Sequence, residues 1–127
     1  MVLLTLLPAI GIAGCLETDR SKSETELKCF TIATATERDL ASRIQVRDEL
    51  QAGGHVPPEL ESENQAYRSR EAQQLSATKS VKERFLAAWA EAETGRSDAI
   101  QDEADRQSDE YRIQFLNREC GGELPVT

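Results

Sequence analysis

The sequence predicts an all-α protein, an antiparallel bundle of three long helices. Three observations support this fold class. Apolar residues recur at steps of three and four after residue 23, charged residues make up 30% of the chain and separate them, and aromatic residues are only 5%. Glycine-containing breaks divide the chain into three such stretches, at Gly53-Gly54, Gly95 and Gly121-Gly122.

The first helix is predicted to begin at Ser23, because Ser23 to Glu26 fits a capping box. It ends at Gly53-Gly54, since glycine tolerates the left-handed conformation that helix ends favour. The patch 31–36 has strand character because it carries three threonines, but we interpret it as part of one continuous helix. The predicted inward positions are Leu27, Phe30, Ala33, Leu40, Ile44 and Leu50.

The second helix follows the turn at 55–58 and is predicted to begin near Pro58, since proline fits a first helical turn. The segment 61–80 is polar on nearly all sides, which predicts a solvent-exposed helix or a bend. Its predicted core positions are Tyr67, Gln74 or Leu75, Thr78, Val81, Phe85, Trp89 and Ala92.

The third helix is predicted to follow the break at 94–96, with Ser97 as N-cap and Asp98 in the first turn. It should stop at Gly121-Gly122, leaving 123–127 as a loose tail. The inward stripe is Ile100, Ala104, Ser108, Tyr111 and Phe115, with Ile113 and Leu116 to one side.

The first fifteen residues predict where the protein resides. An uncharged, mostly apolar run from Val2 to Gly14 is too short to span a bilayer, which takes about 20 apolar residues. Its length is typical of a signal peptide, although no charged residue precedes Glu17. An ordinary cleaved signal and a buried N-terminal helix are two interpretations of such a run, and the residues at its end favour a third.

The segment Ile12-Ala13-Gly14-Cys15 resembles the lipobox of bacterial lipoproteins. That resemblance implies a signal peptide over 1–14 and acylation of Cys15, which would anchor the chain to a membrane. Leu16 after the cysteine implies the outer membrane, facing the periplasm of a Gram-negative cell. Residues 15–22 would form a lipidated tether, and 23–122 the helical domain.

If Cys15 carries lipid, Cys29 and Cys120 remain, and an oxidising periplasm would let them form a disulfide. Two free thiols are the alternative. Three antiparallel helices would hold the pair about 15–25 Å apart, against a disulfide Cα spacing of about 5.5 Å. A fold-back near 75–80, giving four helical segments, would bring them together. A first helix that starts late, near Thr34, would do the same.

The charge of −8 predicts no binding to nucleic acid and favours a basic protein partner. The only histidine, His55, lies in a turn and has no metal-ligand partners at suitable spacing, so we expect a solvated residue. Acidic clusters are interpreted as solvated helix faces, and Trp89 with Phe85 as core. They are 59–63, 91–93, 102–105 and 109–110. No catalytic motif, cofactor site or metal site is predicted.

The sequence therefore predicts a small acidic envelope protein, anchored at Cys15, that acts by protein binding or scaffolding and not as an enzyme. The segment Phe115 to Cys120 is similar to the end of LprI-type lysozyme-inhibitor domains, although this chain lacks that family's additional cysteines. That resemblance implies an alternative function, inhibition of a basic cell-wall hydrolase such as lysozyme.

Overall fold

The computed structural model describes the backbone of residues 2–126 and the side chains of residues 23–93 and 95–126. It consists of α1 (Val2–Ala52), η1 (Pro58–Leu60), α2 (Glu61–Arg84), α3 (Leu86–Glu91), α4 (Thr94–Arg106) and α5 (Asp109–Glu119). No strand occurs among these residues, so the all-α class is confirmed. The predicted signal peptide, Cys15 and the tether lie outside the residues whose side chains are described, and they stay predictions.

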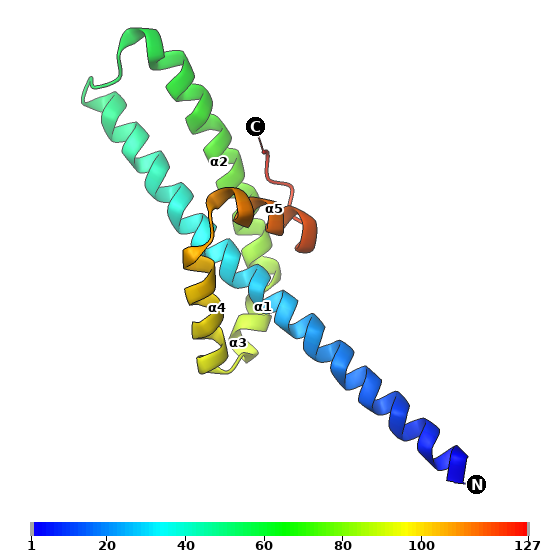
Figure 1. The fold of residues 1–127 in the computed structure, drawn as a ribbon. Coiled ribbons are helices and arrows are strands. Elements are labelled where there is room, and N and C mark those ends of the chain that lie inside the picture. The colour runs from blue at the N-terminus through cyan, green and yellow to red at the C-terminus, as the bar shows by residue number, and fades with distance from the viewer. Residues whose placement is uncertain (1, 127) are drawn as a thin grey trace.

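Helices α1 and α2 form a long antiparallel hairpin (Figure 1). The predicted stop at Gly53-Gly54 is confirmed. Gly54 has φ of +71°, and the amide of His55 donates to the Leu50 carbonyl at 2.9 Å. The amide of Gly54 donates to the Gln51 carbonyl at 3.2 Å, which completes a Schellman motif. The chain then turns through η1 at Pro58 into α2.

The hydrophobic core lies around the middle of α1, where α2, α4 and α5 pack against it. Cys29 of α1 and Cys120 after α5 form a disulfide there, with Cα atoms 5.7 Å apart. The core cluster contains Cys29, Ile32, Ala33, Ala35, Val81, Ala104, Ile113, Phe115, Leu116, Cys120 and Leu124. Helices α1, α2, α4 and α5 and the C-terminal segment all contribute to this one cluster.

Helix α1 is continuous through Ser23, where the sequence predicted its start, and through the threonine patch 31–36, which has strand character. Ser23 lies inside α1, so the predicted start at a capping box there is wrong. The threonine patch is helical, because Thr34 and Thr36 donate their hydroxyls to the carbonyls of Phe30 (2.9 Å) and Ile32 (2.7 Å). These bonds satisfy the hydroxyls without leaving the helix.

Helix α2 is also uninterrupted, so the predicted fold-back near 75–80 is wrong. Thr78 in this segment is buried and donates its hydroxyl to the Gln74 carbonyl at 2.7 Å. The chain breaks later, at Phe85 and before Thr94, where α4 begins. Ser97 therefore lies inside α4 and does not cap it.

The predicted third helix is split in two at Gln107-Ser108. Ser108 is the N-cap of α5, and its hydroxyl accepts a hydrogen bond from the Tyr111 amide at 3.2 Å. Because of this break α4 runs up along α1 and α5 runs back down, crossing it (Figure 1). Cys120 thus returns to the end of the bundle where Cys29 lies, which three unbroken helices could not achieve.

The C-terminal segment is docked and not loose as predicted. Leu124 is 3% exposed, and the Asn117 side chain exchanges two hydrogen bonds of 2.9 Å with its backbone. The Gln74 side-chain amide donates to the Pro125 carbonyl at 2.6 Å. The segment therefore joins α5 to α2.

Candidate functional site

The outer part of the α1–α2 hairpin extends beyond the core (Figure 1), and Arg43 at its inner end contacts Asp109 of α5. We call residues 41–70 the arm. Burial ends at Leu40 on α1 and resumes at Glu71 on α2, and none of the described side chains between them is buried. The arm therefore has no hydrophobic core of its own.

Polar contacts hold the two helices of the arm together. The guanidinium of Arg47 contacts Glu71, and it donates to the Asn64 side chain at 3.2 Å. The Arg68 guanidinium donates two hydrogen bonds to Asp48, at 2.6 and 3.1 Å. These hydrogen bonds with Arg68 hold the pKa of Asp48 below its usual range, so Asp48 is charged at neutral pH.

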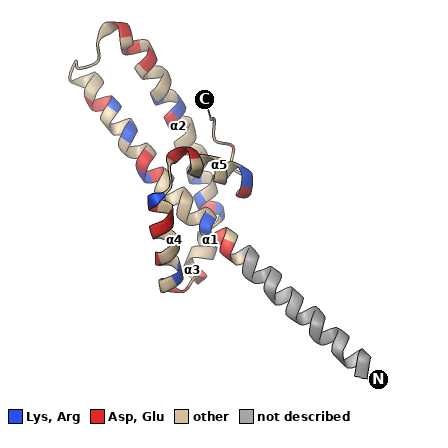
Figure 2. Cartoon of the chain, in the orientation of Figure 1, with Lys and Arg blue, Asp and Glu red and all other residues tan. Residues whose placement is uncertain are grey.

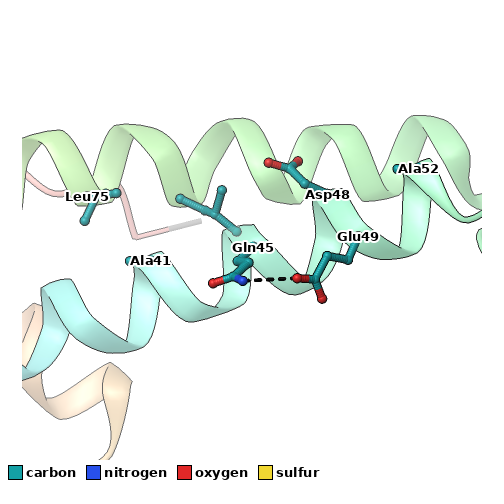
Figure 3. Close-up of a pocket in the computed structure, with 7 residues that line it drawn as sticks. Ala41, Gln45, Asp48, Glu49, Ala52 and Leu75 are labelled. Carbon is teal, nitrogen blue, oxygen red and sulfur yellow. Dashed lines mark hydrogen bonds between the residues drawn. The ribbon is translucent and has the colours of Figure 1, made fainter.

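One side of the arm carries an open groove of about 520 Å³ between α1 and α2 (Figure 3). Its α1 residues recur every three or four positions, which places them on one helical face. Most of the exposed lining is methyl and methylene surface, and the Gln45 side chain donates to Glu49 at 3.0 Å along the rim. The lining is Ala41, Ile44, Gln45, Asp48, Glu49, Ala52 and Leu75.

Large apolar side chains are exposed elsewhere on the arm. Val46 is 50% and Leu50 is 42% exposed, and both lie outside the groove lining. Leu60 and Tyr67, on the returning half of the arm, are 45% and 39% exposed. Four of the eight exposed large apolar side chains among the described residues lie on the arm, and the others are Leu86, Trp89, Tyr111 and Val126. Groups of exposed apolar side chains are typical of an interaction surface.

The end of the arm is acidic. From Asp48 to Tyr67 the sequence holds five carboxylates and neither Lys nor Arg, and red dominates this end in Figure 2. Within the described part of the chain, no ion pair is made by the four glutamates of this stretch, which are Glu49, Glu59, Glu61 and Glu63. These four glutamates are exposed and are therefore open to a cationic group, whereas Asp48 is already paired with Arg68.

Several predicted core positions are exposed instead. Leu50 and Tyr67 lie on the arm, Tyr111 is 44% exposed, and Trp89 is 49% exposed although it stacks on Phe30 with ring centroids 5.5 Å apart. Trp89 was predicted to lie in the core, but only about half of its side chain is buried, against Phe30. The periodic pattern identified the inward face of each helix but not whether another helix covers it.

The remaining candidate residues carry little chemistry in the structure. His55 is exposed in the turn after α1, as expected for a solvated residue. The acidic clusters at 59–63, 91–93 and 102–105 are exposed, and Asp109 is half-buried beside Arg43 and Arg112. No group of three metal-ligating side chains occurs among the described residues.

Comparison with known proteins gave no relative. No family model, no curated protein and no solved structure matches this chain. Over the part of the chain that the structure describes, no helix has the length and apolar character needed to cross a membrane.

Proposed function

We propose that this chain is a lipid-anchored protein of the bacterial cell envelope that binds another protein through its arm and performs no catalysis. One observation supports the binding role above all others. The arm has no buried side chain, yet Val46, Leu50, Leu60 and Tyr67 are exposed on it. Their apolar surface contributes little to folding and is free to be buried against a partner.

The anchor is proposed at Cys15, with 15–22 as tether and the outer membrane, facing the periplasm, as location. The lipobox-like segment before Cys15 supports this placement. From Ser23 to the end of α1 at Ala52 the helix rises about 40 Å. An anchor before Ser23 would therefore leave the arm at the far end of α1, away from the lipid surface.

The anchor is tested by fractionating cells that express wild type or Cys15→Ser. We expect wild type in the membrane fraction and the variant in the soluble fraction. Equal membrane association of the two proteins would contradict lipidation at Cys15.

The binding role is tested by pull-down from envelope extract with wild type and a Leu50→Glu/Leu60→Glu double variant. Both side chains are exposed, so we expect a folded variant that loses the partner. Val126→Glu, at a site that is 63% exposed outside the arm, is the matched control and should retain the partner. Equal capture by all three proteins would contradict binding through the arm.

Inhibition of a basic cell-wall hydrolase is a second candidate, supported by the acidic end of the arm and its exposed Leu50 and Leu60. The purified protein would be added to lysozyme in a lysis assay of cell-wall suspensions. Inhibition that Leu50→Glu/Leu60→Glu abolishes would support this candidate. Unchanged lysis would exclude lysozyme and leave the general binding role in place.

A further inference from the structure

One side of α1 is covered near the core and open on the arm. Helix α3 follows α2 after the break at Phe85, and its Trp89 stacks on Phe30 of α1. Phe30 and Glu37 lie at helical spacing from Ala41 and Ile44, so all four lie on one side of α1. At Phe30 this side receives an aromatic side chain of the protein's own chain, whereas at Ala41 and Ile44 it lines the open groove.

The size and the floor of the groove suit a second helix. From Ala41 to Ala52 the groove extends about 16 Å, or three helical turns. Its lining includes the small side chains of Ala41 and Ala52 beside the larger Ile44 and Leu75, and Figure 3 shows Ala41 and Ala52 at opposite ends of this stretch of α1. Small residues in a helix surface form holes that accept large apolar side chains of a neighbouring helix.

The charges beside the groove select the occupant. Glu49 is exposed and belongs to the lining, whereas Glu59, Glu61 and Glu63 lie outside it toward the end of the arm, and Glu63 lines a separate pocket with Tyr67. The lining contains no Lys or Arg, and its other carboxylate, Asp48, is already paired with Arg68. A second copy of this chain, with its charge of −8, would bring like charges together, whereas a cationic helix would meet opposite ones.

We infer that the groove binds an amphipathic helix of a partner protein, with large apolar residues at i, i+3 or i+4 and i+7 and with Lys or Arg on its flanks. This inference rests on the proposed binding function and specifies its partner. The apolar anchors would fill the holes beside Ala41 and Ala52. A flanking cation would face Glu49, and the other glutamates of the arm's end would attract the cationic helix from outside the groove.

The test uses the full chain in nonionic detergent and two fluorescent 18-residue helical peptides with the same leucine positions. One peptide has Lys at all other positions and the second has Glu. Titration by fluorescence anisotropy, corrected for peptide with micelles alone, should show about tenfold or greater preference for the Lys peptide. A benzophenone at the centre of the peptide should cross-link to residues 41–52 and Leu75.

Two variants and a matched control locate the site. Ile44→Asp places a charge on the groove floor, and Glu49→Lys reverses an exposed rim charge at little cost to folding. Each should weaken binding of the Lys peptide about tenfold. Val46→Asp introduces the same charge as Ile44→Asp on the same helix, outside the lining, and should bind as wild type does. Circular dichroism of every variant checks the fold.

Three results would overturn the inference. They are equal affinity for both peptides, cross-links confined to the face of Val46 and Leu50, or a wild-type dimer that Ile44→Asp converts to a monomer. The last would assign the groove to a second copy. If the arm still captures a natural partner while the Lys peptide fails to bind, the proposed function stands and only this inference fails.

Discussion

At the scale of single residues, Arg112 joins three helices through one buried guanidinium. Its side chain is 5% exposed. It donates to the carbonyls of Ala104 (3.0 Å) and Gln107 (2.9 Å) at the end of α4. The same group contacts Asp39 of α1 and, at 3.2 Å, Asp109 in the first turn of α5. Arg112 therefore fixes the angle between α4 and α5.

Replacing Arg112 should be strongly destabilising. Arg112→Ala leaves half-buried Asp39 with Arg38 alone, at 3.6 Å, and removes the side-chain donor from the carbonyls of Ala104 and Gln107, so we expect a loss of about 3–5 kcal/mol. Urea unfolding followed by circular dichroism measures it. Arg118→Ala is the matched control on the same helix, and it removes an ion pair whose Arg side chain is 64% exposed. That control should cost about 0–1 kcal/mol, and equal losses for the two variants would contradict the role of Arg112.

Asp39 makes the stability depend on pH. Its burial alone would raise the pKa, but the hydrogen bond and the charge of Arg112, with those of Arg38, outweigh burial and hold the pKa of Asp39 below its usual range. The unfolded state then binds more protons than the folded state as the pH falls below about 4. The contribution of this pair to the free energy of unfolding is complete above about pH 4, and it is lost as the pH falls through the lowered pKa of Asp39.

We expect the unfolding midpoint to fall between about pH 4 and pH 2, and Asp39→Asn to remove part of that fall. Urea melts at pH 2, 3, 4 and 7 measure it. Asp102→Asn, an exposed carboxylate on α4, serves as control and should keep the slope of wild type. A slope in Asp39→Asn that equals the slope of wild type would contradict the assignment to this pair.

At the scale of elements, the arm and the base of the hairpin differ in what stabilises them. The base, residues 27–40 of α1 and the part of α2 beside them, is stabilised by buried apolar side chains. The arm is held together by polar contacts such as those of Arg47 with Glu71 and Asn64. Local opening is easiest where few apolar contacts must be broken. The arm should therefore open without unfolding of the core.

Hydrogen exchange tests this difference. We expect amides of residues 41–70 to exchange at least tenfold faster than those of 27–40. Glu71→Ala removes the buried partner of Arg47 and should speed exchange in 61–70 further, with little change in α5. Protection of the arm equal to that of 27–40 would show that the polar contacts are as stabilising as the core.

The same elements show what the sequence could predict and why the rest could not be predicted. Glycine in a left-handed conformation has a distinct signature, so the stop at Gly53-Gly54 was found. The break at Gln107-Ser108 was missed, since α5 presents Phe115 to the same core as Ala104 of α4 and the inward spacing continues across it. Ser108 followed by two acidic residues was the available signal, of the kind used at Ser97.

The open groove was missed for a related reason. Ile44 and Leu50 continue the apolar pattern of α1 beyond the core, and periodicity reports a face without reporting what covers it. The polar character of the segment after Glu61 was the available signal. A helix without an apolar face cannot bury one on its neighbour, so the solvent-exposed alternative was correct for 61–70, whereas Glu71, Gln74 and Thr78 of the same predicted segment are buried.

At the scale of the whole molecule, the Cys29–Cys120 disulfide closes a loop of 91 residues around nearly all of the core. It joins α1 to the residue that follows α5, two positions 91 residues apart in the sequence. An entropic cross-link of this span restricts the unfolded chain by about 4–5 kcal/mol, which measured values often fall short of. A domain of this size has little stability from burial alone, so the bond should decide whether it stays folded.

Reduction should therefore lower the stability of the whole domain and not only of α5. We expect the double variant Cys29→Ser/Cys120→Ser to unfold with a free energy about 2–5 kcal/mol smaller than wild type, and wild type in dithiothreitol to match it. Urea unfolding of all three samples measures this, with circular dichroism for the helices and Trp89 fluorescence for the packing of α3 against α1. Both probes should report the same transition, because helices α2, α3, α4 and α5 all contact α1. Stability unchanged by reduction would show that the helices alone hold the bundle, and an early loss of Trp89 fluorescence alone would show that α3 unfolds as a separate unit.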